Sequence, residues 1–327
     1  MPFPHLSRFI LPFTRFEWPG CDRLFNLFVG GQKQNAYWQN WQPKNIRARE
    51  HNYLIQLDLA HWQDRFTYFY GRPYDIGVQL TLKHFIQPGD HVLDIGANTG
   101  QHTLLMAELV ESSGHVDAFE PNTECCNRIR TQIKHNNIQH VALHETALDH
   151  LEQPATLSIA PQEPNLGTLA EPCPAAAPSF SLKQHVHTQI GDHFLHNIPE
   201  HNRRPVNLIK IDVEGHEPRT LRGLNWTLQK DKPLILSEVN PRCLAWANTS
   251  PEQLFLLMNE LGYHAYLIST HHKRWREHKL TLTPVTNHQI ESTQDILWIH
   301  HSDTINQRRV DALTPQDQPT HTLKKAA

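Results

Sequence analysis

The sequence predicts an α/β fold in which helices cover both faces of a mostly parallel sheet, with an additional segment at the N-terminus. Three observations support this prediction. Short apolar runs alternate with helical segments from residue 90 onward. A glycine-flanked turn directly follows the first of these runs. Acidic side chains follow later runs, at the end where parallel strands bring side chains to one edge of the sheet.

The α/β part begins with an apolar strand at 91–95, a glycine turn at 96–100 and a helix at 101–110. Further strands are expected at 116–119, 140–148, 206–213, 234–238, 263–268 and 295–300, and further helices at 123–135, 217–228 and 251–261. Strands that alternate with helices at this spacing form βαβ units with right-handed crossovers. The sheet is therefore expected to be mostly parallel.

Residues 1–75 are predicted to form an aromatic-rich cap on the α/β domain, which spans 76–301. This segment holds 17 of the 28 aromatic residues in the chain. Its rings either pack on the main domain or offer a stacking surface to a ring-shaped substrate or a partner subunit. Within the cap, residues 53–59 and 65–70 are typical of short strands.

Two segments interrupt the regular pattern. Residues 153–179 contain six prolines and predict a largely irregular loop, within an insert at 153–185. Such a loop serves either as a lid or as a tolerated surface insertion. Residues 302–327 are polar, contain two prolines and predict a disordered tail.

The composition excludes several classes of protein. With 30 Lys+Arg against 33 Asp+Glu, the net charge is −3, which argues against nucleic acid as the main partner. No apolar run approaches the roughly 18 residues of a membrane span, and the N-terminus lacks a signal-cleavage pattern. Five cysteines without a CxxC pair predict neither a zinc ribbon nor a disulfide framework. A cytoplasmic location is therefore expected.

The turn Asp94-Ile-Gly-Ala-Asn-Thr-Gly100 is expected to bind a cofactor. Its glycines allow a tight turn and close backbone approach to a ligand. The carboxylate of Asp94 would repel a pyrophosphate but favour an ammonium or sulfonium group, and S-adenosyl-L-methionine (SAM) carries both. The predicted cofactor-binding residues of this turn are Asp94, Gly96, Ala97, Asn98 and Gly100.

Two further strand ends extend this predicted cofactor site. Glu120 ends the second strand, 20 residues after Gly100, where a carboxylate accepts hydrogen bonds from both ribose hydroxyls. Backbone groups of Ala147 and Leu148, at the end of the third strand, are expected beside an adenine, with Asp149 accepting from its amine. An ordinary turn at that strand end is an equally good interpretation. Asn122, two residues after Glu120, completes the set of expected cofactor-binding residues.

The fourth strand delivers four titratable side chains to the same edge. They are Asp212, Glu214, His216 and Glu217. A purely structural reading also exists, in which Glu217 caps the next helix and Gly215 only makes the turn. The expected catalytic residues are Asp212, Glu214 and His216.

Three motifs together resemble those of the FkbM-type SAM-dependent methyltransferases. They are DIGANTG at 94–100, AFEPN at 118–122 and IKIDVEGHE at 209–217, and the resemblance covers roughly 53–300. It implies a Rossmann-like class I methyltransferase sheet with an antiparallel terminal strand. It also implies methyl transfer to a hydroxyl of a saccharide, lipid or natural product. His216 departs from the small residue common in the family.

The resemblance implies that Gly96, Asn98 and Gly100 line the cofactor, that Glu120 holds the ribose, and that Asp212 and Glu214 face the transferred methyl. We expect in-line displacement at the sulfonium methyl, with Asp212 taking the acceptor proton late. His216 is the alternative base. A divalent metal held by Asp212, Glu214 and His216 is a third reading, although no metal site is expected.

Other interpretations stay open from the sequence alone. A non-catalytic relative would keep the SAM pocket and act as a partner subunit. An NAD-dependent oxidoreductase would use Glu120 on its ribose but lacks the central G-x-G. A homo-oligomer is possible. The loosely spaced histidines at 185–196 are poor evidence for a metal site.

Overall fold

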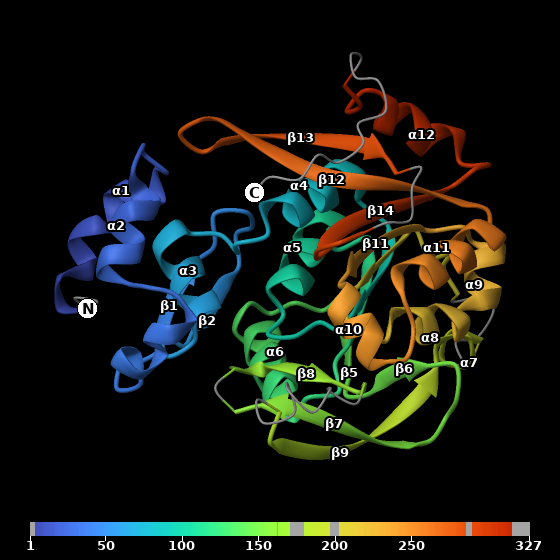
Figure 1. Cartoon of the computed structure of the whole chain (residues 1–327), viewed down its shortest axis with the longest axis horizontal. Coiled ribbons are helices and arrows are strands. Elements are labelled where there is room, and N and C mark those ends of the chain that lie inside the picture. The colour runs from blue at the N-terminus through green and yellow to red at the C-terminus, as the bar shows by residue number, and fades with distance from the viewer. Residues whose placement is uncertain (1–3, 162, 171–179, 197–202, 286–289, 316–327) are drawn as a thin grey trace.

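The computed structural model describes residues 4–161, 163–170, 180–196, 203–285 and 290–315. Its centre is an eight-stranded sheet in the order β13-β12-β14-β11-β10-β3-β4-β5 (Figure 1). The parallel strands are β3 (His91–Ile95), β4 (His115–Phe119), β5 (Val141–His144), β10 (Leu208–Ile211) and β11 (Leu234–Val239). The expected Rossmann-like class I methyltransferase sheet is confirmed by this order and direction.

The reversed strand is β14 (Gln294–His300), which lies antiparallel between β11 and β12 (Tyr263–Arg274). The expected antiparallel terminal strand is thus confirmed, although it lies inside the sheet rather than at its edge. An additional strand, β13 (Glu277–Pro284), pairs antiparallel with β12 and extends the sheet. It was not predicted.

Helices cover both faces of this sheet because its strands bury alternate side chains on opposite sides. Val92 belongs to one buried cluster and its neighbour Leu93 to the other. On the Val92 side lie α4 (Ile76–Phe85), α5 (Gln101–Val110) and α12 (Thr304–Asp311). On the Leu93 side lie α8 (Glu217–Arg222), α9 (Asn225–Lys230) and α11 (Pro251–Glu260). The remaining helices of the main part are α6 (Thr123–His135), α7 (Gly191–His196) and α10 (Pro241–Trp246).

The proline-rich insert is not the predicted irregular loop over most of its described length. It forms a four-stranded sheet in the order β6-β9-β7-β8, from β6 (Ala147–Asp149), β7 (Pro154–Ala160), β8 (Glu163–Thr168) and β9 (Leu182–Ile190). The prolines fit these strands because Pro154 opens β7 and Pro164 lies in the edge strand β8, where a missing N–H costs little. Residues 171–179 lie outside the described part.

Three other elements differ from expectation. The strand predicted at 140–148 divides into β5 and β6, which belong to different sheets. The helix predicted at 217–228 is two helices, α8 and α9. The segment from 302 was predicted to be disordered, but 304–311 form α12, which buries Val310 against the core; residues 316–327 lie outside the described part.

The N-terminal segment is mainly helical. It contains two 3₁₀ helices, η1 (Pro4–Ile10) and η2 (Gln32–Trp38), the helices α1 (Leu11–Arg15), α2 (Cys21–Phe28) and α3 (Trp62–Tyr70), and the antiparallel pair β1 (Lys44–Arg47) and β2 (Leu54–Leu57). The strand predicted at 65–70 is therefore wrong. Helical spacing places the rings of Phe66, Phe69 and Tyr70 together against Phe25, and this packing overrides their strand propensity.

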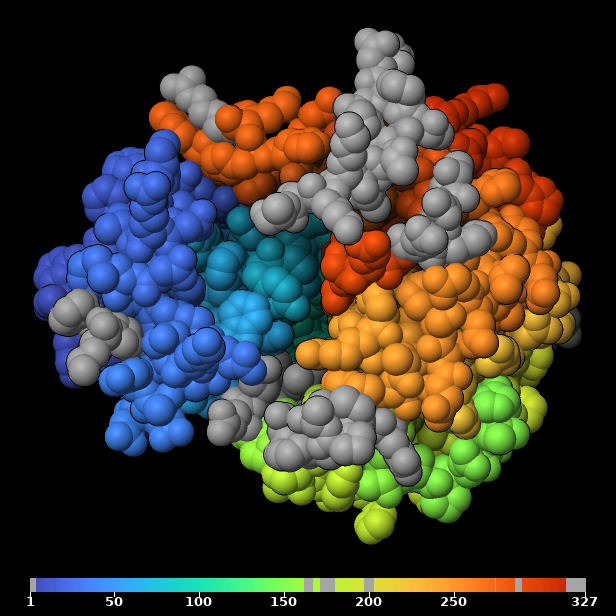
Figure 2. All heavy atoms as spheres, in the orientation of Figure 1, coloured from blue at the N-terminus to red at the C-terminus, as the bar shows by residue number. Residues whose placement is uncertain are grey.

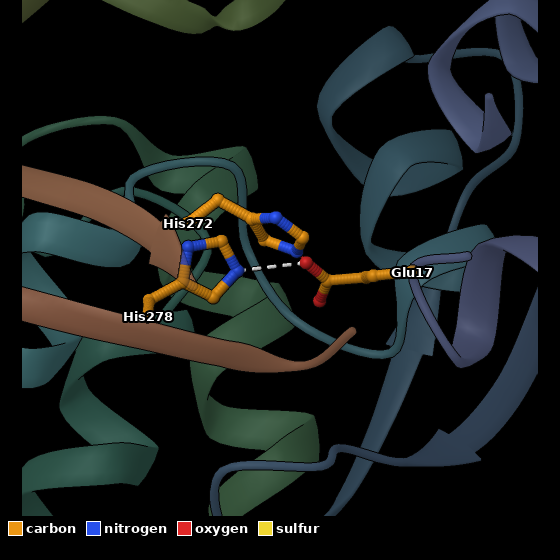
Figure 3. Close-up of side chains that lie close together, drawn as sticks. All are labelled: Glu17, His272 and His278. Carbon is orange, nitrogen blue, oxygen red and sulfur yellow. Dashed lines mark hydrogen bonds and ion pairs between the residues drawn. The ribbon is translucent and has the colours of Figure 1, made fainter. Parts of the chain in front are cut away.

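Glu17, between α1 and α2, fastens the N-terminal segment to the rest of the fold. Its carboxylate accepts hydrogen bonds from Arg49 at 2.6 Å and from Arg72 at 2.9 Å. His278 of β13 lies 2.8 Å away, and His272 of β12 points toward the same group (Figure 3). Although burial acts to raise it, the pKa of Glu17 falls to about 2 because Arg72, His278 and Arg49 favour the charged form.

No helix in the described ranges has both the length and the apolar character needed to cross a bilayer.

Candidate functional site

A cavity opens where the carboxyl ends of β3, β4, β10 and β11 meet. It encloses about 920 Å³, counting the part open to solvent. Figure 2 shows the surface hollowed between the N-terminal segment in blue and the C-terminal part in orange. The sequence-predicted residues that line this cavity are Gly96, Asn98, Glu120, Asn122, Ala147, Leu148, Asp212, Glu214 and His216. Asp94, Ala97 and Gly100 do not line it, and Ala97 borders a smaller adjoining cavity.

The turn after β3 holds two strand ends together. Gly96 has φ of +78°, and a Cβ built on it would lie 1.9 Å from the carbonyl oxygen of Asp212. The Asp212 N–H donates to the carbonyl of Ile95 at 3.0 Å. A side chain at position 96 would therefore separate β3 from β10. Gly100 serves packing instead, because its Cβ would lie 2.9 Å from the Ile129 side chain in α6.

Glu120 is held in a fixed orientation over this turn. Its Oε2 accepts from the backbone N–H of Asn98 at 2.7 Å, and its Oε1 accepts from the N–H of Asn122 at 2.8 Å. Burial raises the pKa of Glu120 to about 7, although the two N–H groups act to lower it. Each carboxylate oxygen accepts about two hydrogen bonds, so one position on each stays available to a diol.

Asp94 lies beneath the turn rather than in the cavity, which corrects the expectation that it meets the cofactor. It is fully buried, accepts from the hydroxyl of Thr103 at 2.6 Å and lies 3.6 Å from the ammonium of Lys210. Lys210 also lies 3.4 Å from Asp212. Burial opposes the charge of Lys210, but Asp212, Asp94 and Asp75 raise its pKa. Asp94 thus helps to keep this buried cation charged.

The far end of the cavity is lined by the start of β6. Ala147 and Leu148 face it, as expected for residues beside a flat base. Asp149 does not line the cavity: Arg219 donates to both of its oxygens at 3.1 and 3.0 Å, and His216 lies 3.1 Å away. The expectation that Asp149 accepts from an adenine amine is therefore not supported, because its oxygens already have partners.

Three carboxylates converge on the opposite wall. Oxygens of Asp212, Glu214 and Glu238 all lie within 4.8 Å of one another. Burial and the charge of Asp212 raise the pKa of Glu214 to about 7. Burial and the charges of Asp212 and Glu214 raise the pKa of Glu238 to about 10. This wall therefore favours cations and hydrogen-bond donors over anions.

Sequence reasoning missed Glu238, although it lies near the carboxyl end of the fifth predicted strand, where the same rule that found Asp212 applies. The metal reading with Asp212, Glu214 and His216 is also changed. Within the described ranges, Glu238 takes the place of His216 in the group able to hold an ion, and the histidines at 185–196 form no such group. His272 and His278 approach Glu17 closely enough, but Arg49 and Arg72 already neutralise that carboxylate.

His216 lines the cavity with a ring that is buried. Its Nε2 lies 3.1 Å from Asp149, which in turn is held by Arg219. Among the residues that the structure describes, none forms a hydrogen bond with its Nδ1. Asp149 thus orients the ring, as a carboxylate orients a histidine in many catalytic sites.

The remaining walls come from segments outside the strand ends. Gln63 of α3 and Tyr74 contribute from the N-terminal side. Leu157 of β7 and Gly167 of β8 contribute from the insert. Thr168 donates its hydroxyl to the backbone carbonyl of Glu214 at 2.9 Å, so the insert is bonded directly to the acidic wall. The sequence contained no local signal for these contacts.

The smaller adjoining cavity lies near the start of α5. It shares Tyr74, Asn98 and Asp212 with the main cavity. It is also lined by Asp75 and His102, whose charged atoms lie 3.2 Å apart. This part of the site therefore offers groups of both signs, as an amino-acid moiety with an ammonium and a carboxylate requires.

Residues 94–265, more than half of the chain, match the family model described as "Methyltransferase FkbM domain". Among curated proteins, the chain is 30% identical to "Methyltransferase 1" of Beauveria bassiana over 148 residues, which cover 41% of this chain and 58% of that protein. It is 26% identical to a ribosomal protein L11 methyltransferase of Geobacillus kaustophilus over 125 residues, which cover 38% of this chain and 37% of that protein. The chain thus spans about half the length of these curated relatives.

Among solved structures, the chain is similar to an FkbM methyltransferase of Methylobacillus flagellatus. That structure is 13% identical, with a TM-score of 0.34 over 70% of this chain and 56% of the other. A precorrin-6y C5,15-methyltransferase of Geobacter metallireducens is 12% identical, with a TM-score of 0.40 over 69% of this chain and 88% of the other.

Proposed function

Because the chain belongs to the FkbM family of methyltransferases, whose cofactor is S-adenosyl-L-methionine, we propose that it methylates a hydroxyl group of a saccharide, lipid or natural product. The main observation behind this proposal is that two carboxylates from different strands line the same cavity. Glu120 faces it from the end of β4 and Asp212 from the end of β10, with the Gly96 turn between them.

The residues that line the cavity fit SAM. Glu120 keeps one acceptor position on each oxygen for the ribose hydroxyls, and Ala147 and Leu148 flank the position for the adenine. Because Gly96 has no Cβ, the backbone of Asp212 can lie directly against the turn, which brings Asp212 and Glu120 to the same cavity. Asn122 orients Glu120 through its N–H and caps α6 through its side chain. When bound, SAM supplies an electrophilic methyl group on a sulfonium.

Asp212 is our candidate base. Its side chain is 40% exposed and lies at the junction of the two cavities, so it can reach an incoming hydroxyl. A carboxylate is far less basic than an alkoxide, so Asp212 takes the proton only as the oxygen gains its new bond. Lys210 donates a hydrogen bond to Asp212 at 3.4 Å and so helps to orient its carboxyl group. His216 is the alternative base, oriented by Asp149.

The acidic wall also bears on the acceptor. The wall of Asp212, Glu214 and Glu238 offers several hydrogen-bond acceptors to hydroxyl groups, and the proton that Glu238 retains makes it a donor as well. Tyr74 adds an aromatic face on the same cavity. A polyhydroxyl acceptor such as a saccharide satisfies both features. An uncharged lipid or natural-product hydroxyl satisfies the acidic wall as well.

The proposal is tested by transfer of a labelled methyl group from SAM to fractionated cell extract and to defined saccharides. We expect label in an ether that survives base, with Asp212→Asn lowering kcat by about 100-fold or more while SAM affinity stays within about threefold. The matched control is Glu260→Gln, an exposed carboxylate at the end of α11. If Asp212→Asn turns over normally and His216→Ala does not, His216 is the base.

Two other readings give different results in the same experiments. A non-catalytic partner subunit would bind SAM in calorimetry without incorporating label. An oxidoreductase would be stabilised by NAD and not by SAM in thermal unfolding. The four cysteines that the structure describes are buried and free, which agrees with our proposal that the chain acts in a reducing cytoplasm. Sedimentation velocity would measure whether the chain forms a homo-oligomer.

A further inference from the structure

The first helical segment of the chain carries a second apolar face that points to solvent. Along η1, α1 and the turn after them, Leu6, Phe9, Phe13 and Phe16 are separated by three and four positions, which places them on one side of a helix. Their exposed fractions are 48%, 62%, 40% and 46%. Trp18, 40% exposed, contacts the ring of Phe13 edge-on at 5.1 Å and continues the stripe.

The opposite side of the same segment is firmly attached to the protein. Ser7, Ile10 and Thr14 are buried, and Thr14 donates its hydroxyl to the carbonyl of Phe69 in α3 at 2.7 Å. Glu17 is fixed by Arg49 and Arg72. The segment therefore cannot rotate to bury its phenylalanines. Figure 1 shows α1 and α2 at the outer edge of the molecule, where the stripe is accessible.

Arginines lie beside this stripe, and the N-terminal segment is basic overall. Between residues 4 and 49 the chain has seven Lys or Arg and two acidic residues, a net charge of +5 in a chain of net −3. Both acids are engaged: Glu17 by arginines, and Asp22 by the hydroxyl of Tyr70. The guanidinium of Arg8 lies 5.2 Å from the ring of Phe9, and that of Arg276 lies 4.1 Å from the ring of Phe16.

We infer that this stripe, formed by Leu6, Phe9, Phe13, Phe16 and Trp18, docks on a membrane surface that contains anionic lipid. Aromatic and aliphatic side chains enter the headgroup region, and neighbouring arginines contact anionic headgroups. A two-fold contact between copies would bring Arg8 and Arg276 of both chains to the same interface, where like charges repel. Charge complementarity thus favours lipid over a second copy.

Docking here would also orient the proposed catalytic cavity. Helix α3, on which Thr14 is anchored, contributes Gln63 to the cavity wall. The membrane-facing stripe and the cavity are therefore joined through one rigid helix. This inference goes beyond the proposed methyl transfer and does not require that the acceptor be a lipid.

The test is co-sedimentation of the full chain with vesicles of phosphatidylcholine containing roughly one third phosphatidylglycerol, compared with phosphatidylcholine alone. We expect binding to the anionic vesicles, weakened by added salt, because screening reduces attraction to headgroups. The double variant Phe9→Ser/Phe13→Ser should lose about tenfold or more in affinity. The control Leu256→Ser/Ile305→Ser removes two apolar side chains, 56% and 74% exposed, from α11 and α12 and should bind as the wild type does.

Three results would overturn the inference. They are no binding to either vesicle, equal binding to both compositions, and retention of binding by the double variant. A wild-type dimer that becomes a monomer in the double variant would also overturn it, because the stripe would then be an interface between copies. Thermal unfolding and SAM binding by calorimetry verify that the variant is folded, and both should match the wild type because the two rings are exposed.

Discussion

The backbone carbonyl of Asp212 occupies the space that a side chain at Gly96 would need, at 1.9 Å from an ideal Cβ. This contact joins the cofactor turn to the end of the strand that carries the candidate base. The turn proposed to bind SAM and the strand end that carries Asp212 are thus in direct backbone contact.

Gly96→Ala is therefore expected to be severely destabilising. The new methyl group must displace backbone rather than a flexible side chain, and φ of +78° is itself strained for alanine. We expect the free energy of unfolding to fall by roughly 2–5 kcal/mol in urea denaturation. Gly31→Ala is the control, because nothing lies within 4 Å of its Cβ and its φ is negative. A Gly96→Ala protein as stable as the control would contradict this geometry.

Glu120→Gln should abolish most SAM binding. The amide cannot accept from both the Asn98 and Asn122 N–H groups and also from two ribose hydroxyls, so we expect affinity to fall by roughly 100-fold in calorimetry. In the wild type, affinity should weaken as pH falls below about 7, the pKa to which burial raises Glu120, because the protonated group is a poorer acceptor. An unchanged affinity in Glu120→Gln would exclude it from the cofactor site.

Glu238 should make the free energy of unfolding depend on pH. Burial and neighbouring acids raise its folded-state pKa to about 10, so the folded chain retains a proton that the unfolded chain releases. Its stabilisation is therefore fully present below the ordinary carboxyl pKa and is lost as pH rises toward about 10. We expect Glu238→Gln to lose less stability than the wild type between about pH 5 and pH 8, with Glu260→Gln as the control. Equal losses would show that Glu238 is solvated.

Glu17→Gln should loosen the attachment of the N-terminal segment. The change removes the carboxylate that pairs with Arg72, whereas Arg49 keeps its ion pair with Glu50, and we expect a loss of about 3 kcal/mol near neutral pH. Because the folded pKa of Glu17 is about 2, the stabilisation is present above the ordinary carboxyl pKa and disappears as pH falls through about 2. Glu291→Gln, at an exposed position, is the comparison. Chemical denaturation of both variants measures the difference.

Removal of divalent ions separates the two chemical roles of the acidic wall. With Asp212 as a base beside Lys210, turnover should be unaffected by EDTA within about twofold. If Asp212, Glu214 and Glu238 instead hold an ion, EDTA would abolish turnover and magnesium would restore it. The restored activity would then increase with pH as protons leave Glu214, whose pKa is about 7.

Most of the central sheet could be predicted because its signals are local. Apolar runs such as 91–95 and the glycine turn after them can be recognised without knowing which segments they contact. Because the carboxyl ends of parallel strands lie at one edge of a sheet, Glu120 and Asp212 could also be predicted to lie close together. The same rule could have found Glu238. Glu238 ends the fifth predicted strand, just as Glu120 follows the second.

What the sequence did not reveal depends on contacts between distant segments. Residues 65–70 have strand propensity, yet packing against Phe25 makes them helical. The prolines of the insert suggested a loop because the pairing of β7 with β9, which tolerates Pro154 at a strand start, is not visible locally. Asp94 was misplaced because its partner, Lys210, lies on another strand.

The bond from Thr168 to the backbone of Glu214 has an evolutionary consequence. One wall of the cavity is made by strands buried on both sides, where change is costly. The other is made by the sheet β6-β9-β7-β8 and the N-terminal segment, where substitutions cost less stability. Substitutions in this second wall can therefore change which acceptor fits, while the residues proposed to hold SAM stay the same.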